Sequence, residues 1–93
     1  MPDEIEFEWD DGNIGHLAVQ GVTPSEFEQV VNNEPLDLDY ESIDGEDRYR
    51  AVGLTVAGRL LTVVFTIRSG KVRGITSFAA TAADRKAFLE STR

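Results

Sequence analysis

The sequence contains no cysteine, only one histidine, and no long hydrophobic run. Without cysteine, the chain can form neither a disulfide framework nor a thiolate zinc site. The longest apolar run, inside "RLLTVVFTIR", is far too short to span a bilayer as a helix. The acidic opening "MPDEIEFEWDD" lacks the apolar segment of a signal peptide. We therefore expect a single cytoplasmic domain over residues 1–93, with no membrane-spanning segment.

Basic residues are absent from the whole first half of the chain. Residues 1–47 contain fifteen Asp and Glu but no Lys or Arg, whereas residues 48–93 contain nine Lys and Arg and two acids. The halves therefore carry charges of −15 and +7 within a net charge of −8. This asymmetry allows three interpretations. The halves attract each other within one fold, the basic half binds phosphates, or the halves pair between chains in a homo-oligomer.

Local patterns at the start of the chain predict a strand and a short helix. In residues 5–10, "IEFEWD", apolar and acidic residues alternate, as they do in a half-buried strand. Asp10 or Asp11 can cap a helix that ends in a left-handed turn at Gly21. The expected buried face of this helix comprises Ile14, Leu17 and Ala18.

The next helix has the strongest local signal in the sequence. Thr23 stands as the N-cap before Pro24, and Glu26, three positions after the cap, completes a capping box. The segment "NNEP" is expected to end the helix. The residues expected to be buried in and before it are Val22, Phe27, Val30 and Val31.

The second half predicts an antiparallel meander. Residues 36–47 form either a polar acidic loop or a short edge strand around Leu36, Leu38 and Tyr40. Strands are expected over 47–55, 60–67 and 71–78, because short glycine-containing turns separate three apolar segments. The better core face of the central strand comprises Leu61, Val63, Phe65 and Ile67.

A last helix completes the expected architecture. Thr81 caps it, Asp84 occupies its third position, and Phe88 and Leu89 are expected to pack back on the sheet. The order β-α-α-β-β-β-α describes an α+β fold with helices packed on an antiparallel sheet.

Three segments of the chain resemble the BrnT family, in the same order as in that family. They are "FEWDDGNIGHLAVQGVTPSEFEQVV", "RYRAVGLTVAGRLLTVVFTIR" and "KVRGITSFAATAADRKAF". The first is similar to a family pattern of W-D, a short helix, H-G-V-[ST] and a Glu-rich helix. The second is similar to R-[YF], G-x-[ST]-x-x-G-R-x-L and V-V-[FY]-T. The third lies where the family has R-[IV]-I-S-A-R-x-A-[TN]-x-x-E-x-x-x-Y.

The resemblance implies a RelE-like α+β fold and the toxin half of a bacterial type II toxin–antitoxin pair. Such a toxin is a ribonuclease that acts on RNA without a metal or cofactor and is silenced by a BrnA-like antitoxin protein. The ribose 2′-hydroxyl attacks the adjacent phosphate, a base takes its proton, and an acid protonates the leaving oxygen. Cations stabilise the extra negative charge of the transition state.

Residue by residue, the resemblance suggests two groups of site residues. Arginines at three positions and one histidine match the family, and Thr76 replaces its serine. The catalytic candidates are His16, Arg59, Arg73 and Thr76. The substrate-binding candidates are Arg48, which also matches a family arginine, with Arg50, Arg68 and Lys71.

Four positions depart from the family pattern. Gln20 replaces a histidine, Val19 a basic residue, Phe78 an arginine at a strand end, and Phe88 a tyrosine. An acid or base, a phosphate contact and a proton donor of the family are therefore missing. This leaves two functional hypotheses open: a ribonuclease toxin, or a non-enzymatic interaction module that retains the fold.

Several candidates also have a plain structural explanation. His16 can be an exposed histidine without a role, and the arginines can pair with the carboxylates of residues 1–47. The adjacent acids Asp10-Asp11 and Glu46-Asp47 are better explained as helix caps and turns than as a metal site. Trp9 alternates with strand residues and is expected in the core rather than as a stacking platform for bases.

Overall fold

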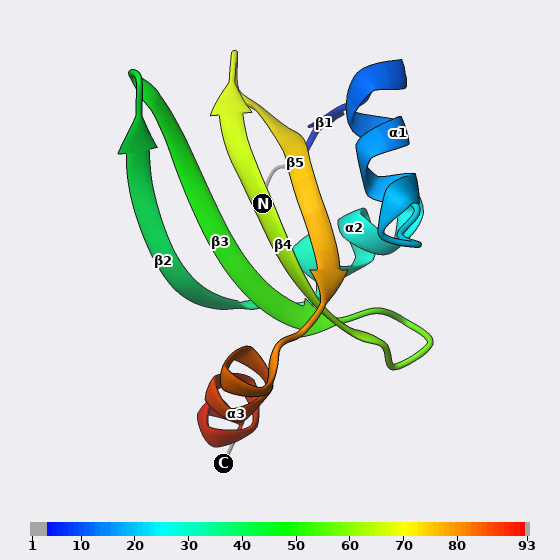
Figure 1. Ribbon diagram of the computed structural model, residues 1–93, viewed down its shortest axis with the longest axis vertical. Coiled ribbons are helices and arrows are strands. Elements are labelled where there is room, and N and C mark those ends of the chain that lie inside the picture. Colours follow the sequence, from blue (N-terminus) through cyan, green and yellow to red (C-terminus); the bar gives the residue numbers. More distant parts are fainter. Residues whose placement is uncertain (1–3, 93) are drawn as a thin grey trace.

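The computed structural model describes residues 4–92 and contains one five-stranded sheet with three helices (Figure 1). Asp3 and Arg93, which count in the charges of the two halves, lie outside the described residues. The sheet has the strand order β1-β5-β4-β3-β2, and every neighbouring pair is antiparallel except β1 with β5. The elements are β1 (Phe7–Glu8), α1 (Asp11–Val19), α2 (Pro24–Asn32), β2 (Leu36–Ile43), β3 (Glu46–Leu54), β4 (Leu60–Arg68), β5 (Lys71–Ala79) and α3 (Ala82–Ser91).

This arrangement confirms the predicted α+β fold with a mostly antiparallel sheet. Of the two alternatives for residues 36–47, the edge strand is found, and at eight residues β2 is a full partner of β3. The first strand is shorter than predicted, because only Phe7 and Glu8 pair with β5, and Ile5 is exposed. No helix within residues 4–92 is long and apolar enough to cross a membrane.

Tight turns hold the meander in register. Asp44 and Gly45 have φ of 51° and 80°, and Ser69 and Gly70 have φ of 52° and 76°. Two consecutive positive φ values are the signature of the two-residue turn whose twist matches that of antiparallel strands. The β2–β3 and β4–β5 hairpins are therefore fixed locally by short Asp-Gly and Ser-Gly sequences.

The predicted helix caps are all confirmed. The Asp10 carboxylate accepts the Asn13 backbone N–H at 3.1 Å, and the Thr23 hydroxyl accepts that of Glu26 at 3.1 Å. Thr81 caps α3 in the same way. Each cap satisfies a backbone donor that the first turn leaves unpaired, so the three helices start where the sequence indicates.

The buried face of α1 differs from the prediction. Leu17 is buried, but Ile14 is 39% exposed and Ala18 is exposed, while the polar Asn13 is buried. The Asn13 side-chain amide donates to the backbone carbonyls of Glu8 and Gly74. This residue therefore fastens α1 to the strands β1 and β5, a role that an apolar-periodicity pattern does not reveal.

The core lies between the sheet and the helices α1 and α2, on what we name the helix-bearing face. Its buried residues are Leu17, Val22, Phe27, Val30, Ala51, Leu61 and Val63. Trp9 packs against this core, as predicted, with its ring 5.3 Å from that of Phe27 in an edge-on arrangement. A Cβ at Gly74 would lie only 2.7 Å from the Trp9 ring, so this position needs glycine for the indole to lie on β5.

The predicted core face of β4 is correct for three of its four residues. Leu61 and Val63 are fully buried and Phe65 is partly buried, but Ile67 is 54% exposed. The reason is that α1 and α2 cover only part of the sheet. Behind the upper ends of β2 and β3 no helix is drawn (Figure 1).

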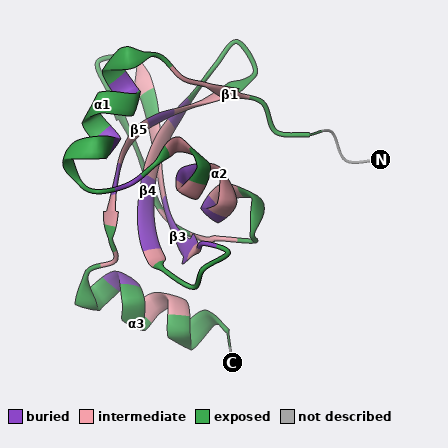
Figure 2. Ribbon diagram, turned by 90° about the vertical axis from the view of Figure 1, so that its right-hand side faces the viewer, coloured by how far each residue is buried: buried purple, intermediate pink, exposed green. Residues whose placement is uncertain are grey.

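The opposite face of the sheet, which we name the open face, carries α3 at one end, and α1 borders it beside β5 (Figures 1 and 2). Asp84 in the first turn of α3 is 5% exposed and accepts hydrogen bonds from Arg50, at 2.9 Å, and from the Thr62 hydroxyl, at 2.7 Å. Phe88 is partly buried, but Leu89 is 54% exposed, contrary to the prediction. The helix is therefore attached mainly by its first turn.

We predict that Arg50→Ala lowers the free energy of unfolding by about 3 kcal/mol, because it leaves the buried Asp84 carboxylate without its cation. Arg48→Ala is the matched control on the same strand, since Arg48 pairs only with the half-exposed Glu46, and its expected cost is about 0–1 kcal/mol. Urea unfolding of both variants measures this difference. Equal losses would show that the Arg50–Asp84 pair does not anchor α3.

Candidate functional site

The open face contains two adjoining hollows. The first, of about 570 Å³, is lined by residues of β2 to β5 that include Glu41, Arg48, Arg50, Ile75 and Thr76. The second, of about 250 Å³, lies between α1 and the ends of β4 and β5, and its lining includes His16, Thr66, Arg68, Arg73 and Ile75. Because Ile75 lines both, the two hollows adjoin, and we treat them as one candidate site.

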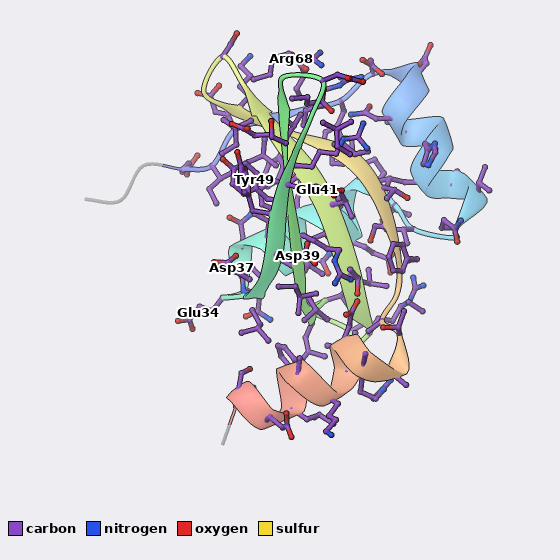
Figure 3. The ribbon with its side chains drawn as sticks, turned by 60° about the vertical axis from the view of Figure 1, so that its left-hand side comes forward. Glu34, Asp37, Asp39, Glu41, Tyr49 and Arg68 are labelled. Atoms are coloured by element: carbon purple, nitrogen blue, oxygen red, sulfur yellow. The ribbon has the colours of Figure 1, made fainter. Side chains whose placement is uncertain are left out.

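Strand register explains why these side chains share a face. Arg50, Val64 and Thr76 are direct partners across β3, β4 and β5, and Thr66 is the partner of Arg73. Residues opposite each other in an antiparallel pair lie on the same side of the sheet. Figure 3 shows the edge of this face, where Asp39 and Glu41 point away from the side on which Tyr49 lies.

Six of the eight sequence-predicted site residues therefore come together. Arg48, Arg50 and Thr76 line the first hollow, and His16, Arg68 and Arg73 line the second. Lys71 lies at the end of the β4–β5 hairpin, and its ammonium group is 4.0 Å from Glu6. His16 is exposed on α1, on the side that faces the second hollow.

Arg59 is not brought to this site. Its guanidinium donates to the Glu26 carboxylate at 2.7 Å and to the Gly21 carbonyl at 3.2 Å, beside the start of α2. Hydrogen bonds from the Thr23 backbone and then from Arg59 hold the pKa of Glu26 below its ordinary value. The resemblance suggested a catalytic role for Arg59, but its contacts are those of a residue that ties the β3–β4 turn to α2.

The cations between residues 48 and 73 all pair with carboxylates of the first half. This confirms the interpretation in which the two halves attract each other within one fold. The pairs are Arg48–Glu46 (3.1 Å), Arg50–Asp39 (2.9 Å), Arg59–Glu26 (2.7 Å), Arg68–Glu8 and Arg68–Glu46 (3.8 Å each), Lys71–Glu6 (4.0 Å), Arg73–Asp10 (2.8 Å) and Arg73–Glu8 (3.2 Å).

Arg73 is the best buried of these cations, with a side chain 20% exposed. Its hydrogen bond holds the pKa of Asp10 below the ordinary value of 3.8, and the Asn13 backbone N–H adds to this effect. In return, the bond to Asp10 raises the pKa of Arg73 above its ordinary value. Asp10 thus has two roles, because it caps α1 and pairs with a cation of the candidate site.

All three nitrogens of the Arg50 guanidinium donate hydrogen bonds to carboxylates. Its Nε and Nη2 donate to Asp39, and its Nη1 donates to both oxygens of Asp84. These bonds, with Asp39 first, raise the pKa of Arg50 above its ordinary value. Its position on the open face therefore serves to join β2, β3 and α3 rather than to offer a free guanidinium.

Two site residues were missed by reasoning from the sequence. Glu46 lies between the hollows and pairs with both Arg48 and Arg68. Its spacing of two from Arg48 on one strand was a usable signal, because such residues share a face. Asn13 lines the second hollow, but nothing in the local sequence indicates that it is buried.

Three of the four departures from the family pattern lie in two different surroundings. Val19 is 83% exposed and Gln20 is the C-cap of α1, so both stand at the end of that helix. Phe78 is the β5 partner of Thr62 and is partly buried on the open face, near the first turn of α3. Within residues 4–92, no group of three or more His, Asp or Glu side chains is arranged to hold a metal ion.

We predict that Asp10→Asn destabilises the protein at pH 7 but not in acid, because asparagine keeps the cap and removes the charge that pairs with Arg73. Since folding lowers the pKa of Asp10, its charge contributes stability that is complete above pH 3.8 and is lost as the pH falls through the lowered value. Urea unfolding between pH 7 and pH 3 measures the difference, with Asp11→Asn as control. A difference that does not change with pH would contradict the assignment.

Comparison with known proteins gives one family match. A model of the family described as "Ribonuclease toxin, BrnT, of type II toxin-antitoxin system" matches residues 9–84, from Trp9 through the first turn of α3. None of the curated proteins matches the chain. The matched segment covers most of the sequence and contains both hollows of the open face. The chain therefore belongs to the BrnT family of ribonuclease toxins of type II toxin–antitoxin systems.

Proposed function

We propose that this chain is a metal-independent endoribonuclease that cuts RNA bound across the open face of the sheet. It would act in the bacterial cytoplasm and be silenced there by a BrnA-like antitoxin. The observation that supports the proposal is the gathering of six candidate residues in two adjoining hollows, within a family of ribonuclease toxins. Arg59 has no part in this site.

The second hollow has one side chain that can transfer a proton and two cations that can contact a phosphate. His16 is the only histidine of the chain, and histidine is the side chain that most often transfers protons in catalysis, so it serves as base or acid. Arg73 and Arg68 stabilise the charge that develops on the phosphate when the 2′-hydroxyl attacks it. The Thr76 hydroxyl, in the adjoining hollow, positions the RNA backbone by hydrogen bonding.

RNA must displace carboxylates to reach these arginines. The Arg68 pairs are long, at 3.8 Å, and both partners are substantially exposed, so they contribute little to stability. A phosphate can accept the same forked hydrogen bonds from a guanidinium as a carboxylate does. Glu8, Asp10 and Glu46 would then act as substitutes for RNA phosphates in the unbound protein.

A second candidate function is that of a non-catalytic interaction protein. Two observations favour it: Phe78 stands where the family has an arginine, and all three nitrogens of the Arg50 guanidinium already donate to Asp39 or Asp84. In this case the open face would bind a protein partner, and the arginine–carboxylate pairs of this face would stay intact. The two candidates differ in whether purified protein cleaves RNA.

Cleavage of labelled RNA in EDTA tests the proposal. We expect the wild-type protein to cleave, and Arg73→Ala and His16→Ala each to lower the rate by about a hundredfold. Arg59→Ala is the matched control, since Arg59 is also paired with a carboxylate but lies outside both hollows. Its expected rate is within about threefold of the wild type.

Two results would contradict the proposal. The first is the absence of cleavage by a protein whose folding is verified by circular dichroism, which would favour the interaction protein. The second is an equal loss in Arg59→Ala and Arg73→Ala, which would place the reaction away from the open face.

A further inference from the structure

Part of the helix-bearing face of the sheet is covered by none of the helices within residues 4–92. It is formed by Tyr40 on β2, Tyr49 on β3, and Phe65 and Ile67 on β4, which we name the aromatic patch. Tyr40 is 55% and Ile67 54% exposed, whereas Tyr49 and Phe65 are partly buried. The patch continues directly from the core, because Phe65 also packs against the buried cluster under α2.

The patch is ordered across three strands. Tyr40 and Tyr49 are direct partners with ring centroids 5.3 Å apart, and Tyr49 and Phe65 are direct partners with nearly parallel rings at 5.5 Å. The Tyr40 hydroxyl is fixed by a 2.6 Å hydrogen bond to Asp47. Rigid tyrosines of this kind lose little side-chain entropy on binding and are common at the energetic centres of protein interfaces.

Acidic side chains surround the patch. Asp47 lies two residues before Tyr49 on the same strand face, and Figure 3 shows Glu34 and Asp37 on the side of the β2–β3 hairpin where Tyr49 lies. No Lys, Arg or His of residues 4–92 is within 4.0 Å of the carboxylates of Glu34, Asp37 or Asp47. These acids differ from those of the open face, which are paired with arginines.

We propose that the aromatic patch is a docking surface for an amphipathic helix of a partner protein, with an apolar stripe flanked by Lys or Arg. The apolar stripe would cover Tyr40, Tyr49 and Ile67, and the basic flanks would pair with the three carboxylates, for which no cation lies within 4.0 Å among residues 4–92. Charge complementarity of this kind selects a basic partner and speeds its association. The inference concerns the face opposite to the RNA site and does not depend on ribonuclease activity.

The dimensions of the sheet fit a helix. Strands are about 4.8 Å apart, so the three strands of the patch span about 10 Å, which is the width that one packed helix occupies. The neighbouring helix α2 already packs on the same face through a stripe that includes Phe27 and Val30. RNA is not the expected occupant, because the unpaired carboxylates would repel its phosphates.

An amphipathic peptide of about 15 residues, with a leucine stripe and lysine flanks, provides the probe. Its affinity for the protein would be measured by fluorescence anisotropy beside that of a peptide with glutamate in place of each lysine. We expect Ile67→Glu to weaken binding of the lysine peptide by about tenfold or more. Leu89→Glu on α3 is the matched control, since Leu89 and Ile67 are both 54% exposed. The Leu89→Glu protein should bind the lysine peptide with unchanged affinity.

A further variant, Asp37→Lys, separates the charge effect from the apolar one and should also weaken binding, by an amount that shrinks at high salt. The proposal would be overturned if the glutamate peptide bound equally well, if Leu89→Glu lost as much affinity as Ile67→Glu, or if no binding were found. Concentration-dependent self-association that Ile67→Glu abolishes would make a second copy of this chain the occupant instead, and would also overturn it.

Discussion

Pairing between the acidic first half of the chain and the cations of the second half holds the outer elements on the sheet. β1 has only two paired residues, so its backbone bonds alone give little stability. Its position is held by Arg73, which bonds Glu8 at the end of β1 and Asp10 just after it, and by the packing of Trp9 on Gly74. An ion pair within the second half fastens α3, whose first turn is tied to β3 by Arg50 and Asp84.

These ion pairs differ in how far they are buried, and burial decides which of them a ligand can break. The Asp84 carboxylate is buried, so breaking its bond to Arg50 would leave an uncompensated charge. The pairs of Arg68 with Glu8 and Glu46 are longer and more exposed, and water or a phosphate can replace these carboxylates at a small cost. The structure thus separates arginines that hold the fold together from arginines that are accessible to a ligand, although the sequence presents them alike.

Features that depend on a few neighbouring residues could be predicted from the sequence. The capping box at Thr23 and Glu26, the cap at Thr81 and the turn at Ser69-Gly70 are such features, and the observed structure agrees with them. The exposures of Ile14, Ile67 and Leu89 could not be predicted, because they depend on which elements lie opposite. Periodicity identifies an apolar face but does not show whether another element covers it.

The candidate site shows the same limit. The register of the strands places Arg48, Arg50, Arg73 and Thr76 on one face of the sheet, and this could be predicted from the strand pairing. His16, on α1, lies beside them. Arg59 was assigned by its motif alone, yet the motif gives no information on the turn that directs it to Glu26. The ion pairs of Arg50 with Asp39 and Asp84 could not be predicted either, because they are long-range contacts with β2 and α3.

The central claim is that the open face binds RNA. It is tested most directly by titrating isotope-labelled protein with an oligonucleotide that lacks the attacking 2′-hydroxyl, and by following the backbone amide resonances. The account predicts shifts that cluster at Thr66, Arg73, Ile75 and Thr76, and that weaken with salt as phosphate contacts require. Shifts confined to the surroundings of Arg59, or an absence of shifts at low salt, would contradict it.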